Sequence, residues 1–339
     1  MQTGVRIKNL DLVRGISTLG IVLYHWSCSF YQHGITDSAG MYQIFYTLFG
    51  IDWGRIAVTM FFVLSGAAMY YNYRPRVKDY KKFYRKRWLS IFPEFYLAFF
   101  AMYLFYIWKY KDIFYKGNPW SFLYSLVGMD GYLLYRGDNY YILGEWFLGA
   151  IIFLYLLFPV FLKIFERWML QGTVVILLLY VINLAVSPFK ISDWNHPLTC
   201  LFAFWIGMIF IKYKEAISWR RIVVGILFCM VMVFMQKRLN SIVVSQAVGI
   251  LLFLILFKIP FKKENFMHRI IKRISLISYS IFLVHHVIIN TIMPRFSGKQ
   301  LHPFMSFMTL VLVFALTIPA ASCLHLAGSK LKKFIEQDR

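Results

Sequence analysis

Long apolar runs alternate with short polar segments along almost the whole chain. A membrane-spanning helix needs about 20 consecutive, mostly apolar residues, and the runs in this sequence have about that length. The runs cover residues 10–32, 51–73, 88–108, 142–163, 171–187, 197–211, 221–236, 241–259, 274–292 and 304–327. This pattern predicts an all-α polytopic membrane protein with about ten transmembrane helices, forming a single transmembrane domain over residues 1–339.

The composition agrees with a membrane protein. Hydrophobic residues make up 60% of the chain and charged residues 15%. The first run follows Arg6 and Lys8, as a signal peptide would, but it ends in YHWSCSFYQ without a small-residue cleavage site, so we predict a retained helix. The four cysteines stand singly and form no C-x-x-C pair, which indicates neither a disulfide framework nor a zinc site. We expect no metal.

The basic residues are distributed unevenly between alternate loops. With the N-terminus inside, the inner segments hold 26 Lys and Arg and the outer segments hold nine. This excess follows the positive-inside rule and predicts that both termini are cytoplasmic. The net charge of +22 therefore reflects topology and contact with anionic membrane lipids rather than nucleic-acid binding. Eight of the inner cations lie in the segment RPRVKDYKKFYRKR, residues 74–87.

Two polar side chains interrupt the first apolar run. Arg14 and His25 are eleven residues apart, so they lie on the same helix face, about 16 Å apart along the axis. An arginine near a helix end can be an interfacial anchor, and a single histidine can be a packing group. In the functional alternative, Arg14 is a fixed cation for phosphates or a carboxylate, and neutral His25 handles a proton or an acyl group.

Further ionisable residues occur in other runs. Glu94 follows a proline in the third run, and we expect it to pair with a cation of the 74–87 segment. His285 and His286 lie in the ninth run, and Arg55 and Glu145 lie near the outer ends of the second and fourth runs. Charges inside a membrane are costly and mark functional pathways, so these residues predict a polar passage. A transporter and a membrane transferase would both need such a passage.

Five stretches together resemble the membrane-bound acyltransferase-3 family, which includes O-acetyltransferases of cell-surface polysaccharides. They are LDLVRGISTLGIVLYH, FGIDWGRIAVTMFFVLSGAAMYY, YRKRWLSIFPEFY, GEWFLGAIIFLYLLFP and ISYSIFLVHHV, in the family's order. The resemblance covers residues 8 to about 327. The Arg-x10-His pattern of the first run is the most specific motif, and FFVLSG and SYSIFLVH are nearly as recognisable.

The resemblance implies a fold of ten helices and an acyl donor, usually acetyl-CoA, used from the cytoplasm. The acyl group is delivered to a sugar hydroxyl on the outer side. Carried over by position, Arg14 and His25 are the essential residues of the first run. His285 is the histidine that ends the ninth-run motif, and Ser65 is the serine of the second-run motif. On this view the pantetheine arm of the donor enters the helices and brings its thioester toward His25.

The chain departs from the family pattern at three points. The family often has two arginines three residues apart before the third-run proline; Arg87 matches the first, Ser90 stands at the second, and Arg85 could substitute. Ile151 stands where many members have a glutamate, and Glu145 is the alternative carboxylate. Some relatives also carry a C-terminal hydrolase-like domain. This chain stops twelve residues after the last run, so we expect direct transfer or delivery to a separate extracytoplasmic partner.

We therefore predict a membrane O-acyltransferase of the bacterial cytoplasmic membrane. It would use acyl-CoA, with acetyl-CoA as the expected donor, and a glycan or lipid-linked sugar as the acceptor. The alternative is a transporter or polysaccharide-export component built on the same helices. Internal inverted repeats would favour transport, and the sequence shows none.

Overall fold

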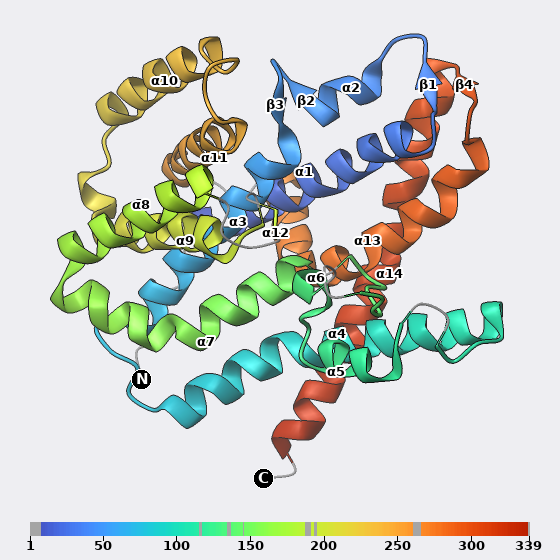
Figure 1. The fold of residues 1–339 in the computed structure, drawn as a ribbon, viewed down its shortest axis with the longest axis horizontal. Helices are drawn as coiled ribbons and strands as arrows, with labels where there is room; N and C mark the ends of the chain where they lie inside the picture. The colour runs from blue at the N-terminus through green and yellow to red at the C-terminus, as the bar shows by residue number, and fades with distance from the viewer. Residues whose placement is uncertain are drawn as a thin grey trace. The chain divides into compact units, whose positions relative to one another are not determined.

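Each of the ten apolar runs folds as a helix or contains one. The computed structural model describes residues 8–114, 117–133, 137–144, 146–186, 191–192, 195–259 and 266–337. The helices that correspond to the runs are α1 (Lys8–Gln32), α3 (Trp53–Tyr73), α4 (Tyr80–Tyr110), α7 (Trp146–Arg167), α8 (Met169–Val186), α9 (Pro197–Lys212), α10 (Trp219–Phe234), α11 (Ser241–Lys258), α13 (Ser278–Ile292) and α14 (Pro303–Gln337) (Figure 1). The prediction of a helical fold is confirmed.

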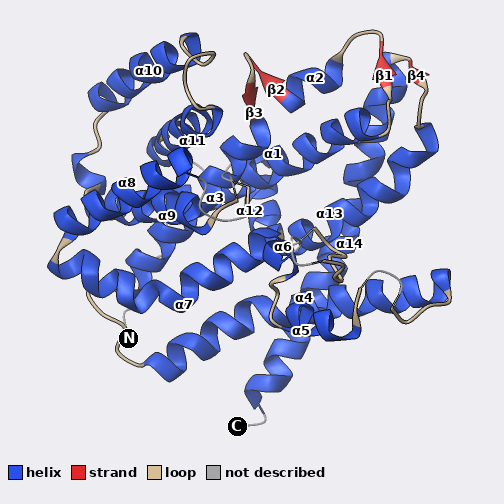
Figure 2. Cartoon of the chain, viewed as in Figure 1, coloured by secondary structure: helices blue, strands red, loops and turns tan. Residues whose placement is uncertain are grey.

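The remaining α-helices and the strands of the described residues are short and lie between these helices. They are the helices α2 (Met41–Tyr46), α5 (Phe122–Leu126), α6 (Asp130–Leu133) and α12 (Phe266–Leu276), and the strands β1 (Thr36–Asp37), β2 (Thr47–Leu48), β3 (Ile51–Asp52) and β4 (Gln300–Leu301). The parallel pair β1–β4 and the antiparallel pair β2–β3 make two small sheets in an otherwise helical chain (Figure 2).

Six helices of the described residues are long and apolar enough to cross a membrane by length and composition: α3, α4, α7, α8, α11 and α14. A seventh crossing would be α12 with α13 and the turn that follows, Ser278–Phe296, which are bent by 76°. The helices α9 and α10 have only 16 residues each. The number of crossings and the side of each terminus therefore stay predictions.

The ninth run is not the single helix that the sequence predicted. Its first residues belong to α12, which ends at Leu276, and α13 begins at Ser278. Basic residues separate the apolar positions of α12, among them Arg269, Lys272 and Arg273, so α12 is amphipathic. An amphipathic helix of this kind favours an interfacial position over a spanning one.

The chain divides into two compact units. The first comprises the described residues among 1–74, 200–278 and 288–316, and in it α3 packs against α1 and α11. Glycines bring α3 and α9 into backbone contact: a Cβ on Gly66 would lie 1.8 Å from the carbonyl oxygen of Phe204, and one on Gly207 would lie 2.0 Å from that of Val63. Small residues at helix contacts are typical of membrane proteins. Gly66 ends the FFVLSG motif, so this motif marks a helix contact.

Polar and small residues also hold α1 within the first unit. The side-chain amide of Asn9 donates to the carbonyl oxygen of Ile259, 3.1 Å away, beyond the end of α11. Gly15 lies against Ile271 of α12, where a Cβ would come within 2.6 Å of a side-chain carbon. At the other end of α1, the buried indole of Trp26 donates to the Thr309 hydroxyl at 3.0 Å.

The second unit comprises the described residues among 75–199, 279–287 and 317–339. It contains α4 to α8 and the parts of α9, α13 and α14 in those ranges. Asp79 caps the start of α4: its carboxylate accepts from the backbone N–H of Lys82 at 2.9 Å. Aromatic rings join α4 to α7, with the centroids of Phe83 and Phe158 5.8 Å apart.

Candidate functional site

Arg14 lies on α1 with a carboxylate one turn before it. Its Nη1 is 3.8 Å from Oδ1 of Asp11, and about a third of the Arg14 side chain is exposed. Asp11 is buried, and the same Oδ1 accepts from the hydroxyl of Ser275 on α12 at 3.1 Å. Part of the positive charge of Arg14 is therefore balanced within the first unit, while the exposed part of the guanidinium can still meet an anionic ligand.

His25 lies further along α1 and packs on its neighbour Tyr24. The two rings meet edge to face with their centroids 5.2 Å apart. The hydroxyl of Tyr24 donates to Oδ2 of Asp52 at 3.0 Å. A Cβ on Gly54 would lie 2.4 Å from the Tyr24 ring, so position 54 must be glycine for this ring to fit.

Arg55 completes this arrangement at the start of α3. Its Nε is 3.7 Å from Oδ2 of Asp52, and its Nη1 donates to the Ser241 hydroxyl on α11 at 2.7 Å. Asp52 thus joins Arg55 to Tyr24, and Tyr24 contacts His25. The structure brings the predicted residues Arg55 and His25 into one polar and aromatic chain of contacts. Ser65, also predicted, is half-buried on α3.

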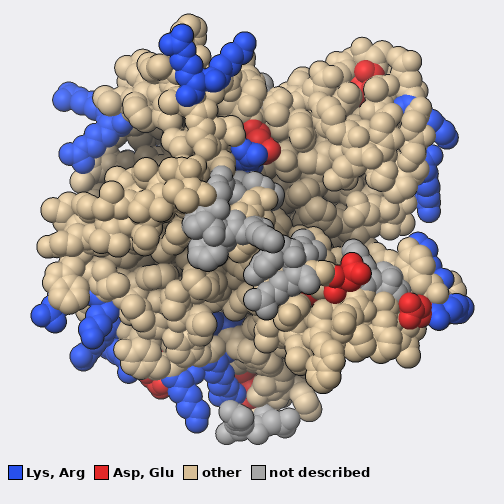
Figure 3. All heavy atoms as spheres, in the orientation of Figure 1, with Lys and Arg blue, Asp and Glu red and all other residues tan. Residues whose placement is uncertain are grey.

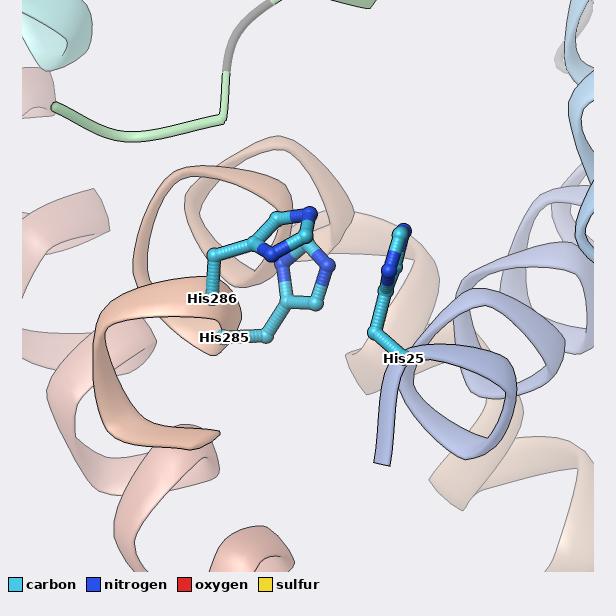
Figure 4. Close-up of side chains that lie close together, drawn as sticks. All are labelled: His25, His285 and His286. Atoms are coloured by element: carbon cyan, nitrogen blue, oxygen red, sulfur yellow. The ribbon is translucent and has the colours of Figure 1, made fainter. Parts of the chain in front are cut away.

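His285 is fully buried on α13 in the second unit, and its ring is fixed by its own helix (Figure 4). Nδ1 lies 3.0 Å from the carbonyl oxygen of Ile281 and 2.9 Å from that of Phe282. Carbonyl oxygens only accept hydrogen bonds, so Nδ1 carries the hydrogen and the neutral ring presents Nε2 as an acceptor.

His286 extends from the same side of α13, and its ring centroid is 4.4 Å from that of His285 (Figure 4). Gly144 lies against it: a Cβ there would be 2.7 Å from the His286 ring, and the backbone φ of +76° also favours glycine. Glu145, the next predicted site residue, lies outside the described residues. Ile151, at the position of the family glutamate, is buried on α7.

Glu94 does not have the partner that the sequence predicted. Its Oε1 lies 2.9 Å from Nδ1 of His325 on α14, and its Oε2 accepts from the hydroxyl of Ser280 on α13. The prediction of a cation from the 74–87 segment is therefore wrong. His325 was not identified from the sequence. It lies two residues before the end of the tenth run, where a polar side chain can reach the interface, so it did not stand out as an interruption deep in an apolar run. The sequence feature that could have pointed to His325 is an ionisable residue in a long apolar run, three positions before a glycine, Gly328.

The basic residues of α4 lie near the start of that helix. Arg85 is exposed, with Nη2 3.5 Å from the carbonyl oxygen of Ile335 on α14, and the guanidinium of Arg87 lies 5.6 Å from the ring centre of Tyr155. Ser90, which stands at the second arginine position of the family, donates to the carbonyl oxygen of Arg87 in its own helix. Lys and Arg outnumber Asp and Glu on the face drawn in Figure 3.

Comparison with known proteins gives one match. The family model described as an acyltransferase domain matches residues 7–326 of the 339. No curated protein and no solved structure shows a match to the chain. The matched region contains every described site residue above apart from the basic end of α14.

Proposed function

Because the chain belongs to the acyltransferase-3 family, we propose that this membrane acyltransferase moves an acyl group from cytoplasmic acyl-CoA to a hydroxyl of an extracytoplasmic glycan or glycolipid. The observation that carries the proposal is the family match over residues 7–326, which includes the Arg14-x10-His25 pattern. The family match supports acyl transfer over the transporter alternative. The proposed location is the bacterial cytoplasmic membrane.

The proposed donor is acetyl-CoA, bound from the cytoplasmic side. Coenzyme A carries several phosphate charges, and arginine side chains bind phosphate through paired charge-assisted hydrogen bonds. Arg14, Arg85 and Arg87 lie near the expected cytoplasmic ends of their helices and retain exposed or half-exposed side chains. We assign phosphate contacts to these three, with Ser65 as a further donor-binding residue by its place in the second-run motif.

The proposed chemistry centres on His25. As a general base, His25 would remove the proton of the acceptor hydroxyl, whose oxygen then bonds to the acyl carbon while the carbon–sulfur bond breaks. As an acyl carrier, its ring nitrogen would first take the acyl group from the thioester and then pass it to the hydroxyl. Both routes release free coenzyme A. We assign a catalytic role to His285 as well, because its fixed ring presents Nε2 in the acceptor form.

Aromatic rings at the far end of α1 support a sugar acceptor. The rings of Tyr24 and Tyr46 stack in parallel with centroids 5.7 Å apart, and Tyr31 lies 4.4 Å from Tyr46. Half of the Tyr31 side chain is exposed. The apolar face of a sugar ring packs on such rings, while Asp52 and Arg55 offer hydrogen bonds to its hydroxyls.

The test is acyl transfer by the purified protein in vesicles. Acetyl-CoA labelled in the acetyl group is supplied on the cytoplasmic side, and a mixture of lipid-linked sugars is supplied as acceptor. We expect label in the glycan fraction and release of free coenzyme A. Glycan that crosses the membrane without acquiring label would instead support the transporter.

A further inference from the structure

Three side chains from three helices of the second unit meet at Glu94. Oε1 accepts from Nδ1 of His325 at 2.9 Å, and Oε2 accepts from the hydroxyl of Ser280. Glu94 lies on α4, Ser280 on α13 and His325 on α14. We call this group the Glu94 cluster. The transfer step proposed above does not use it.

The surrounding helices are shaped to hold the Glu94 cluster. A Cβ on Gly328 would lie 2.2 Å from Cγ of Glu94, so only glycine at 328 lets α14 come this close. The hydroxyl of Tyr279 donates to the carbonyl oxygen of Ile91 at 3.1 Å, next to the proline of α4. A proline inside a helix frees a carbonyl of the preceding turn and bends the helix, so α4 is locally adapted here.

The Glu94 cluster keeps hydrogen-bonding capacity after its internal bonds are made. A carboxylate offers about four lone-pair sites, and His325 and Ser280 occupy two of them. The second ring nitrogen of His325, Nε2, has no protein partner among the described residues. The side chain of His325 is 34% exposed and that of Glu94 is 15% exposed, so a ligand can reach them. The free sites of the carboxylate accept, and in the tautomer that donates from Nδ1 the Nε2 of His325 also accepts, so the cluster suits N–H donors such as those of amide groups.

The position of the Glu94 cluster matches the middle of a long ligand. Arg87 precedes Glu94 by seven residues on the same face of α4, which is about 10 Å along the helix. His285 follows Ser280 by five residues on α13, which is about 7.5 Å. Because Glu94 and Ser280 are in contact, the path along the two helices from Arg87 through the Glu94 cluster to His285 adds up to about 18 Å.

The pantetheine arm of coenzyme A has a matching length and chemistry. About twelve bonds separate its phosphate ester oxygen from its sulfur, which corresponds to about 14 Å in an extended chain at about 3.5 Å for three bonds. The Arg87 side chain can extend toward the phosphate, which accounts for the difference between the length of the arm, about 14 Å, and the path of about 18 Å along the helices. Two amide groups lie in the middle of this arm. An amide that leaves water to lie among membrane helices needs hydrogen-bond partners there.

We propose that the Glu94 cluster is the binding subsite for the amide groups of the pantetheine arm. Glu94 accepts from the N–H of one amide, and Nε2 of His325 accepts from the N–H of the other amide. This proposal rests on the proposed function, because it takes acyl-CoA as the donor. On this proposal, His325 and Glu94 contact the ligand. Ser280 joins Glu94 to α13, the helix that also carries His285.

The test compares two ligands on the purified full-length protein by calorimetry. Coenzyme A has the arm, whereas 3′-phosphoadenosine 5′-diphosphate has the same nucleotide and lacks it. We expect His325→Ala and Glu94→Ala to weaken coenzyme A binding by about 10-fold to 100-fold, as the loss of one or two hydrogen bonds in a desolvated site should. Binding of the nucleotide should stay within about twofold. Arg87→Ala should weaken both ligands.

Two further variants separate binding from folding. Ser322→Ala, one turn before His325 on α14, removes a hydroxyl that bonds only its own helix, and it should leave both affinities unchanged. Glu94→Gln keeps the size of the side chain and an oxygen for Nδ1 of His325, so it should fold normally and still bind coenzyme A more weakly than the wild type. Unchanged coenzyme A affinity in folded His325→Ala and Glu94→Ala would overturn the subsite. Equal weakening of both ligands would also overturn it, because the effect would then be structural. Wild-type protein that binds no coenzyme A would instead contradict the proposed function itself.

Discussion

The contact between α3 and α9 gives a stability prediction whose size follows from the structure. Gly66→Ala places a Cβ 1.8 Å from the backbone carbonyl oxygen of Phe204, and real Cβ contacts are essentially never under 3.0 Å. One helix must therefore move away by more than 1 Å along a closely packed surface. Overpacking of this kind costs about 1–3 kcal/mol, and the upper end applies because the obstacle is backbone and not a flexible side chain.

Gly20→Ala is the matched control for this substitution. Both glycines lie inside helices, so both variants gain the same intrinsic helix preference of alanine. A Cβ on Gly20 would lie 3.5 Å from that of Ala57, which is an ordinary contact. We expect Gly20→Ala to raise the free energy of unfolding by up to about 1 kcal/mol and Gly66→Ala, which adds the clash to the same helix gain, to lower it by about 1–2 kcal/mol. The assay is reversible chemical unfolding in lipid–detergent bicelles. Equal stability of the two variants would refute the packing argument.

Three other predictions concern topology, donor binding and the histidines of α13. The topology is tested in a variant without the native cysteines that carries a single cysteine at the exposed position of Leu123 or of Lys78. The cysteine at 123 should react with a membrane-impermeant reagent only from outside, and the one at 78 only from inside. The reverse pattern would contradict the topology predicted from the charges. Arg14→Lys keeps the charge but loses the planar fork of donors, so the affinity for coenzyme A measured by calorimetry should fall about tenfold, and it should fall further as salt rises. An affinity equal to that of the wild type would show that Arg14 is only an interfacial anchor. With turnover measured from labelled acetyl-CoA, His285→Gln should reduce acetyl transfer by about 10²-fold or more, and His286→Gln should leave the rate within about threefold of the wild type. Equal rates for the two variants would contradict the role assigned to His285.

The helices could be predicted from the sequence because they depend on local patterns. Runs of apolar residues of membrane-spanning length specify a helix whatever the neighbours are, and all ten runs contain one. The break between α12 and α13 was harder to predict, because Ile274 to Leu276 continue the apolar composition of the ninth run although they belong to the amphipathic helix. The available signal was the change from a helix with several Lys and Arg residues to one without either.

The candidate site was only partly predictable for a similar reason. Asp11 lies three residues before Arg14, a spacing at which helical side chains are neighbours, so this pair could have been read from the sequence. Glu94 meets Ser280 and His325 across 186 and 231 residues. Hydropathy and local spacing carry no information about which helices meet, and a single sequence gives no other measure of such long-range contacts. Glu94 could be identified from the sequence as a costly residue in a membrane, but its pairing with Ser280 and His325 could not be derived.

The most direct test of the central claim is acetyl transfer by His25→Ala. The variant should fold and bind coenzyme A like the wild type, because His25 is assigned to the reacting groups and not to the phosphates. Transfer of labelled acetyl groups to the glycan in vesicles should fall by ~10²–10⁴-fold if His25 is the general base, and by more if it carries the acyl group. Expression and melting temperature are measured on the same preparation. A well-folded His25→Ala protein that transfers acetyl groups at the wild-type rate would contradict the account.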